Sequence, residues 1–342
     1  MYGKSVESRE NERPGIYRTF RVESLLGSGG SGTVYKAWHT RLQKHIVVKE
    51  AKNDVAGAIE ARRNEVEALK NVKNEYMPLI FDFIEEDERS FTIMEYIEGE
   101  SFDILLSRGH KFTEPQVLKW YTQIVSALEM IHGLYVYHRD IKPSNIMLRP
   151  TGDVCLIDFN AALVSGNDTR VISHSSGYAS PEQYAYFQLC EKIYKEHKLE
   201  ESQNNRMESS ANPESFLIKS DIITEFTPSA QADVSCYSDK EVEYNPVRID
   251  WKRSDIYSLG ATMYHLLTGK HPPLRADEVI PISKLGDYNE GLVDIIESSM
   301  QFDPFKRFAS AEELSNALEC IKPGFISLVK RVGNHGVKKI CV

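Results

Sequence analysis

The glycine-rich turn "LGSGGSGTVYKA", residues 26–37, constrains the fold of this chain more than any other stretch. Gly27, Gly29 and Gly32 stand at G-x-G-x-x-G spacing, which lets backbone amides approach phosphate oxygens without a side chain in the way. The residues "TVYKAW" that follow are β-branched and aromatic, so they predict a strand. A dinucleotide-binding turn would lead into a helix instead. The turn favours a phosphate-binding hairpin, although the glycines alone fit a flexible turn without function about as well.

Periodicity places this hairpin in a small, strand-rich lobe. Residues 17–94 read as short alternating apolar runs that predict an antiparallel sheet, interrupted by one helical pattern at residues 58–72. After the sheet the apolar spacing becomes helical, as in "EPQVLKWYTQIVSALEMIHGL". We therefore expect an α+β fold with a small antiparallel-sheet lobe at 17–94 and a larger, mainly helical lobe at 95–185 and 250–322.

Three segments fall outside these lobes. Residues 186–249 are polar, net acidic and rich in Ser, Asn and Glu, so we interpret them as a surface insertion. A docking site and a linker without function fit this insertion about equally well. Residues 1–16 form an N-terminal tail. Residues 323–342 form a basic, partly apolar C-terminal tail, which fits a packed terminal element and a partner-binding segment alike.

Charge and cysteine usage narrow the class of protein. The formal net charge of −9 disfavours binding to nucleic acid and to anionic lipid. The 5 cysteines are scattered and form no Cys-x-x-Cys pair, which favours reduced thiols. There is no apolar stretch of membrane-spanning length and no signal-peptide core at the N-terminus. We therefore expect a cytoplasmic protein with no membrane span and no nucleic-acid partner.

Lys49 lies inside the apolar strand "IVVKEA", where an unpaired ammonium group would be costly. Glu65, on the predicted helix, is a natural side-chain partner, and nucleotide phosphates are another. A lysine that faces solvent is the simpler alternative, because most lysines are exposed.

The stretch "YHRDIKPSNIML", residues 137–148, favours nucleotide phosphate as the partner of Lys49. Asp140 offers a carboxylate that can orient a hydroxyl nucleophile, and Lys142 offers a cation for developing phosphate charge. The amide oxygen of Asn145 and the carboxylate of Asp158, after "VCLI", are hard ligands that suit Mg²⁺ bridging phosphates. These residue types in this order indicate phosphoryl transfer.

On these motifs the chain resembles the eukaryotic-type protein kinase family, in its bacterial-like serine/threonine branch, over about residues 17–320 apart from the insertion. The resemblance implies a bilobal protein kinase fold. It also implies transfer of the γ-phosphoryl group of ATP, with Mg²⁺ or Mn²⁺, to serine or threonine hydroxyls of protein substrates, together with autophosphorylation. A further partner would dock through the insertion or the C-terminal tail.

The resemblance assigns roles residue by residue. Asp140 would be the catalytic base, assisted by Lys142, Lys49 and Glu65, while Asn145 and Asp158 would hold metal. The ATP site would comprise Leu26, Gly27, Ser28, Gly29, Gly30, Gly32, Val34, Val47, Lys49, Met94, Glu95, Ile97 and Met147.

An activation segment would follow Asp158 and end at "SPE", with Ser180, Pro181 and Glu182 in the place of Ala-Pro-Glu. Its hydroxyl residues are Thr169, Ser173, Ser175 and Ser176, of which Ser175 would touch Asp140 and Lys142. The resemblance further implies structural roles: Arg139 as a phosphate anchor, Asp255 as support for the catalytic loop, and Glu182 paired with Arg307.

Two departures bear on activity. Val47 stands where the family usually has alanine, and its extra methyls should narrow the adenine pocket slightly. Asn160 replaces the glycine of Asp-Phe-Gly, but asparagine tolerates the left-handed region better than most residues do. In the family this segment switches between a conformation that binds metal and one that does not. We expect Asn160 to shift the balance between these two conformations and to leave metal binding intact. The alternative is a pseudokinase that acts as an ATP-binding or docking scaffold.

Overall fold

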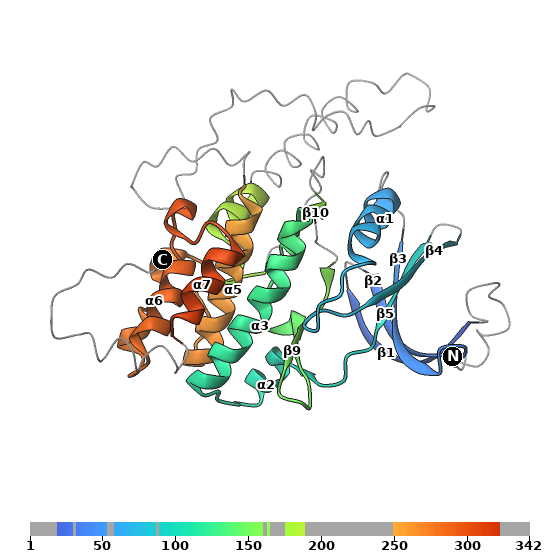
Figure 1. Cartoon of the computed structure of the whole chain (residues 1–342), viewed down its shortest axis with the longest axis horizontal. Helices are drawn as coiled ribbons and strands as arrows, with labels where there is room; N and C mark the ends of the chain where they lie inside the picture. The colour runs from blue at the N-terminus through green and yellow to red at the C-terminus, as the bar shows by residue number, and fades with distance from the viewer. Residues whose placement is uncertain are drawn as a thin grey trace, which may run out of the picture.

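The computed structural model of the chain describes residues 19–29, 32–52, 58–86, 89–159, 163–164, 175–188 and 249–321. These residues form the two lobes that the sequence predicts, one rich in strands and one mainly helical (Figure 1). Some predicted features lie outside the described ranges: Gly30, Asn160, Thr169, Ser173, both tails and residues 189–248 of the insertion.

The first lobe is a five-stranded antiparallel sheet in the order β1-β2-β3-β5-β4. Buried apolar side chains of its strands, including Phe20, Ile46 and Phe91, form a small hydrophobic core. One helix, α1, packs beside the sheet on the side nearer the helical lobe (Figure 1). The elements are β1 (Phe20–Gly29), β2 (Gly32–His39), β3 (Lys44–Lys52), α1 (Ala58–Leu69), β4 (Ile80–Glu86) and β5 (Arg89–Glu95).

The second lobe packs its helices around a continuous apolar core. Its helices are α2 (Phe102–Ser107), α3 (Glu114–Gly133), α5 (Trp251–Thr268), α6 (Glu290–Ser299) and α7 (Ala311–Glu319). Short strands β6 (Glu100–Ser101), β8 (Ile146–Leu148) and β9 (Val154–Leu156) form one sheet, and β7 (Val136–Tyr137) pairs with β10 (Leu163–Val164). Short 3₁₀ turns are η3 (Pro143–Asn145), η6 (Ala276–Glu278), η7 (Ile282–Lys284) and η8 (Pro304–Lys306).

Helix α5 lies at the centre of this lobe and is buried along most of its length, which is typical of a core helix. Asp250 caps its first turn, where Oδ1 accepts hydrogen bonds from the backbone N–H groups of Lys252 at 3.1 Å and Arg253 at 3.3 Å. The helix ends at Gly269, which adopts the left-handed conformation that glycine favours (φ 67°). Such a helix is a rigid base for the loops that contact it.

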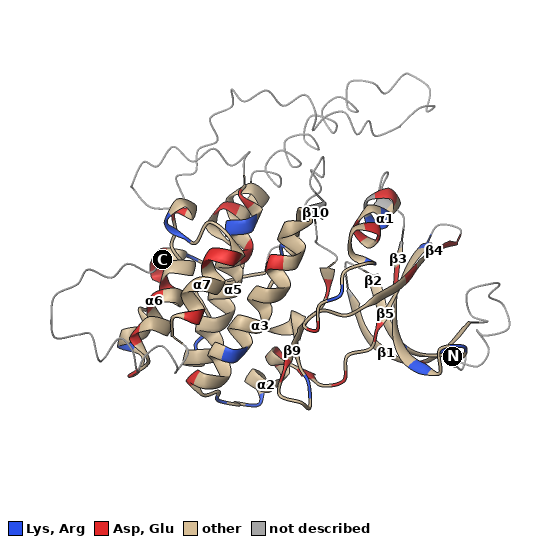
Figure 2. Ribbon diagram, viewed as in Figure 1, with Lys and Arg blue, Asp and Glu red and all other residues tan. Residues whose placement is uncertain are grey.

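Residues 181–188 are helical, so the first three residues of the predicted insertion continue a helix of this lobe. No helix within the described ranges is both long enough and apolar enough to cross a bilayer. Acidic and basic positions are interspersed along the ribbon of both lobes in Figure 2.

Candidate active site

A β-hairpin brings the predicted metal ligands together. Strands β8 and β9 pair antiparallel with Ile146 opposite Leu156, and the Ile157 N–H donates to the Asn145 carbonyl at 2.8 Å. Asn145 therefore lies across the hairpin from Ile157, directly beside the position of Asp158. The turn η3, which begins at Pro143, leads the chain from the loop of Asp140 into this hairpin.

Three side chains that sequence analysis assigned to the site surround Asp140: Lys142, Asn145 and Ser175. Lys142 Nζ donates to Asp140 Oδ2 at 2.7 Å, and Ser175 Oγ donates to Asp140 Oδ1 at 2.7 Å. Lys142 Nζ also reaches Ser175 Oγ at 2.7 Å, so the three groups close a triangle. Asn145 Nδ2 donates to the Asp140 carbonyl at 2.8 Å and to Oδ2 at 3.2 Å. The carboxylate is thereby held in one orientation while its remaining lone pairs can still accept a proton.

Asp255 holds the backbone of the loop that carries Asp140. Its carboxylate is fully buried and accepts the N–H of His138 at 2.8 Å and the N–H of Arg139 at 2.7 Å. His132 Nε2, from the last turn of α3, lies 2.9 Å from Asp255 Oδ2. Arg139 has a left-handed backbone (φ 66°), which is costly for a residue of its size. The buried bonds to Asp255 hold Arg139 in that conformation.

His138 links this loop to the end of β9. Burial lowers the pKa of His138, so the imidazole is neutral. Its Nε2 lies 3.1 Å from the Ile157 carbonyl, which can only accept, and its Nδ1 accepts the Asp140 N–H at 3.4 Å. A neutral ring with its proton on Nε2 satisfies both contacts. The loop of Asp140 and the segment of Asp158 are thus tied together through His138.

Lys49 reaches across from β3 to the second lobe. Its Nζ donates to Asp158 Oδ1 at 3.0 Å, and its side chain is buried. Glu65 and Arg62, on α1, line a cavity of about 120 Å³ with Lys49. The pKa of Lys49 is lowered to about 8: burial lowers it most, the charge of Glu65 partly offsets this effect, and the charge of Arg62 adds to it. The hydrogen bond of Lys49 thus goes to Asp158, and Glu65 acts through its charge.

The predicted nucleotide turn is the β1–β2 hairpin, in which Gly27 pairs with Val34 and Gly29 with Gly32. Gly32 has φ 125°, and a Cβ there would lie 2.2 Å from the Glu50 carbonyl oxygen, so only glycine fits. Val34 stands opposite Lys49 in the sheet. The other predicted ATP contacts lie on the hairpin, on β3, on β8 and at the end of β5: Leu26, Ser28, Val47, Met94, Glu95, Ile97 and Met147.

The donor atoms at Asn145 and Asp158 fit a hard divalent cation. The Asn145 amide nitrogen is committed to Asp140, which leaves its oxygen as the atom for a metal. Asp158 is partly exposed and uses one oxygen for Lys49. Within the ranges that the structure describes, no three His, Cys, Asp or Glu side chains gather as a metal site. A divalent cation held by these two oxygens would need further oxygen ligands from outside the protein.

Comparison with known proteins decides the family. The protein kinase domain matches residues 20–193 of the chain. The chain belongs to the protein kinase family. A probable serine/threonine-protein kinase of Clostridium acetobutylicum is 24% identical over 327 residues, which cover 90% of this chain and 40% of that protein. One of Streptomyces coelicolor is 31% identical over 177 residues (48% and 26%), and a serine/threonine-protein kinase of Corynebacterium glutamicum is 30% identical over 195 residues (54% and 42%). The kinase chain therefore spans less than half the length of these relatives.

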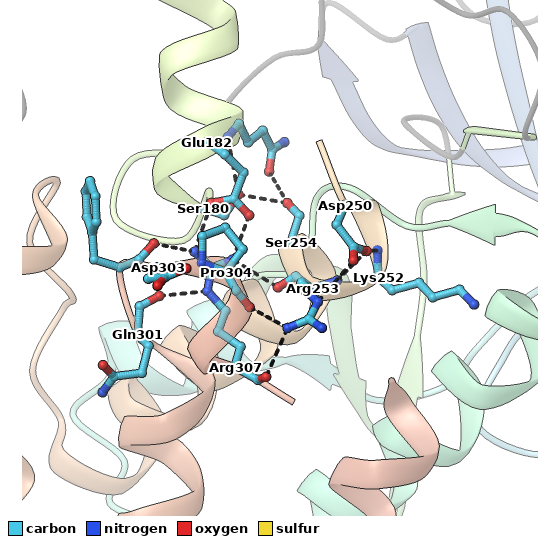
Figure 3. Close-up of polar contacts among 12 residues, drawn as sticks. Ser180, Glu182, Asp250, Lys252, Arg253, Ser254, Gln301, Asp303, Pro304 and Arg307 are labelled. Carbon is cyan, nitrogen blue, oxygen red and sulfur yellow. Dashed lines mark hydrogen bonds and ion pairs between the residues drawn. The ribbon is translucent and has the colours of Figure 1, made fainter. Parts of the chain in front are cut away.

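A buried ion pair fixes the Ser-Pro-Glu turn, residues 180–182, to the helical lobe of this kinase fold. Arg307 donates to both carboxylate oxygens of Glu182, at 2.6 and 2.8 Å, and both side chains are buried (Figure 3). Arg307 also donates to the carbonyls of Gln301, Arg253 and Phe302. This pair joins the Ser-Pro-Glu turn to α5 and to the turn η8.

Sequence reasoning missed three polar residues of the kinase site. Gln183 Nε2 donates to the Arg139 carbonyl at 2.7 Å, and Ser254 Oγ lies 2.8 Å from Ser180 Oγ. The third is His132, whose contact with Asp255 is described above. Gln183 directly follows Glu182 on the same helix, and Ser254 precedes Asp255, so adjacency to assigned residues was an available signal. The helical periodicity of α3 places His132 on the buried face, but periodicity does not name its partner.

We expect Arg307→Met to lower the free energy of unfolding by about 3–5 kcal/mol, because the Glu182 carboxylate would be left buried without a counter-charge. The double variant Glu182→Leu with Arg307→Met should recover the part of that loss that comes from the unpaired carboxylate, since neither charge remains. Urea unfolding followed by fluorescence measures both. Arg63→Met is the matched control, because Arg63 pairs with Glu85 through two bonds at the surface and should cost far less. Equal losses at Arg307 and Arg63 would contradict the structural role.

Proposed function

We propose that this kinase domain transfers the γ-phosphoryl group of ATP, with Mg²⁺ or Mn²⁺, to serine and threonine hydroxyl groups of proteins. The observation that carries the proposal is the triangle of Asp140, Lys142 and Ser175. It supports a hydroxyl acceptor, because a carboxylate and an ammonium group lie together where a nucleophile and a phosphate would meet. Its bacterial relatives are named serine/threonine-protein kinases, which supports serine and threonine as the acceptor residues.

In the proposed mechanism the residues mainly position and stabilise charge. Asp140 orients the substrate hydroxyl and accepts its proton. Lys142 stabilises the charge that develops on the transferred phosphoryl group, and Lys49 contacts the phosphates of ATP. Asn145 and Asp158 would hold the divalent cation, which neutralises phosphate charge when bound. The glycines of the β1–β2 hairpin leave the backbone N–H groups free of side-chain cover, as a phosphate contact requires.

Asp140→Ala should lower peptide phosphorylation by about 10²–10⁴-fold, because general-base and orienting contributions are of that size. The ATP dissociation constant should stay nearly unchanged, since Asp140 is assigned to the acceptor hydroxyl. Phosphate transfer from labelled ATP to a serine peptide and ATP titration measure the two quantities. Asp287→Ala, at an exposed loop carboxylate, is the control. Undiminished transfer by Asp140→Ala would sink the assignment.

Asn160→Gly distinguishes an active kinase from the pseudokinase alternative in the same assay. Asn160 lies outside the described residues, so its assignment rests on sequence. If the wild type is active, this variant should change the rate only modestly, because Asp158 is retained. An inactive wild type that gains strong activity from Asn160→Gly would favour the pseudokinase scaffold.

The wild type should phosphorylate itself on Thr169 or Ser173 when incubated with Mg-ATP. Arg139 is the proposed anchor for such a phosphate. Its guanidinium stacks on Trp251 at 4.4 Å from the ring centroid. Ser175 should stay unmodified because its hydroxyl is held by Asp140 and Lys142, and Ser176 is the remaining candidate. Mass spectrometry locates the phosphate, with Asp140→Ala as the inactive control. An unmodified segment in an active wild type would reject the prediction.

A docking role for residues 186–249 is supported by their acidity and by their position between the Ser-Pro-Glu turn and α5. Deleting residues 190–243, which lie outside the described ranges, should weaken phosphorylation of proteins in a dephosphorylated extract of the source cells. Phosphorylation of a short serine peptide should persist, because the peptide is too small to need a distant docking site. Labelled ATP and gel separation report both. An unchanged extract profile would favour a passive linker.

A further inference from the structure

Near Ser175, a tyrosine and two histidines form a cluster. The proposed mechanism does not use these three residues. The Tyr178 hydroxyl lies 2.6 Å from His265 Nδ1, and their rings stack with centroids 6.2 Å apart. His271 packs edge-on against both, at 5.1 Å from Tyr178 and 5.4 Å from His265. Its Nδ1 lies 2.7 Å from the Pro272 carbonyl, an acceptor, so this nitrogen carries a proton. The cluster joins the end of α5 to the activation segment.

Tyr178, one member of the cluster, lies in the same turn as Ser175. The Ser175 carbonyl accepts the backbone N–H groups of Tyr178 at 3.0 Å and Ala179 at 2.9 Å. Gly177, inside the turn, has φ 80°, and a Cβ there would lie 2.3 Å from the Pro272 carbonyl oxygen. The turn is therefore pressed against the loop after α5, and displacement of Tyr178 would displace Ser175.

Helix α5 supports Asp140 from two sides through residues ten positions apart, or about 15 Å along the helix axis. Asp255, in its first half, binds the backbone of the loop that carries Asp140. His265, in its last turn, binds Tyr178, whose turn places Ser175 on the Asp140 carboxylate. One rigid helix thus fixes both the base and the hydroxyl that contacts it.

We propose that His265, as a neutral imidazole, is a positioning residue that holds Tyr178 and through it keeps Ser175 against Asp140. The inference rests on the proposed phosphoryl transfer. With its proton on Nε2, the neutral ring of His265 accepts a hydrogen bond from the Tyr178 hydroxyl at Nδ1. A second proton would occupy Nδ1 and reverse the bond, so that Nδ1–H would donate to the phenol oxygen. A charged ring would also be partly buried beside His271.

The surroundings of the cluster favour the neutral ring. Burial first, and the electrostatic effect of the neighbouring His271 second, together lower the pKa of His265 to about 4. Burial raises the pKa of Tyr178, and the Asp103 carboxylate at the start of α2 raises it as well, so the phenol keeps its proton. Because the folded pKa of His265 lies below its unfolded value, its contribution to stability is present above about pH 6.5 and is lost as the pH falls toward 4.

Four variants of the full chain test the role, with a serine peptide as substrate. His265→Leu and Tyr178→Phe should each lower kcat about tenfold, as loss of an ordinary hydrogen bond allows, without a change in ATP affinity. The double variant should be no worse than either single one, because both remove the same contact. His265→Asn can place an amide oxygen near the position of Nδ1 and should stay within about threefold of wild type. His110→Leu, at an exposed histidine, is the matched control.

The two His265 variants separate positioning from simple packing. Both remove the imidazole ring, but only His265→Asn keeps an acceptor for the Tyr178 hydroxyl, so its kcat should exceed that of His265→Leu. Equal impairment of His265→Asn and His265→Leu, or multiplicative losses in the double variant, would each overturn the positioning role. A wild type that transfers no phosphate while binding ATP would instead refute the proposed function, and the positioning role would fall with it.

Discussion

The buried carboxylate of Asp255 is the contact on which the catalytic loop depends. A carboxylate without exposure to water is costly, and its cost is offset here by two backbone N–H groups and by the ring of His132. The same bonds require His138 and Arg139 to stay in register with α5, which is itself packed into the lobe core. Asp140 follows these residues directly. The position of Asp140, the proposed base, is therefore set by a residue more than one hundred positions later in the chain.

Backbone strain at Arg139 shows how strictly the loop is held. Arginine rarely adopts a positive φ, whereas aspartate does so more readily, and both Arg139 and Asp158 are in that region. Both backbone polar groups of Arg139 have buried partners: its N–H donates to Asp255, and its carbonyl accepts from Gln183. Gln183 belongs to the helix that starts after Ser180, so this helix helps to stabilise the strained residue. The shape of the loop therefore depends on the packing of that helix against it.

Sequence alone predicted the two-lobed fold and the short-range grouping of the candidate site residues, because both depend on local spacing. Alternation predicts the sheet, and Asp140, Lys142 and Asn145 lie within six residues, so their meeting needs no knowledge of the fold. His132, Gln183 and His265 could not be assigned in this way, since each acts on a residue distant in the chain. The contact of Lys49 is similar: sequence offers Glu65 on the neighbouring helix, but the folded hairpin brings Asp158 into hydrogen-bond range.

The side chains of Lys49 and Asp158 are unequally exposed, which suits the proposed role of Lys49 in binding phosphate. The lysine side chain is 8% exposed whereas the aspartate side chain is 38% exposed, so most of the desolvation cost falls on the ammonium group. That cost is incurred when the chain folds, before any nucleotide arrives. An anion that enters the site then meets a cation already stripped of water, with Glu65 and Arg62 acting on its charge from α1. Preorganisation of this kind strengthens the attraction for phosphate without a further desolvation of Lys49.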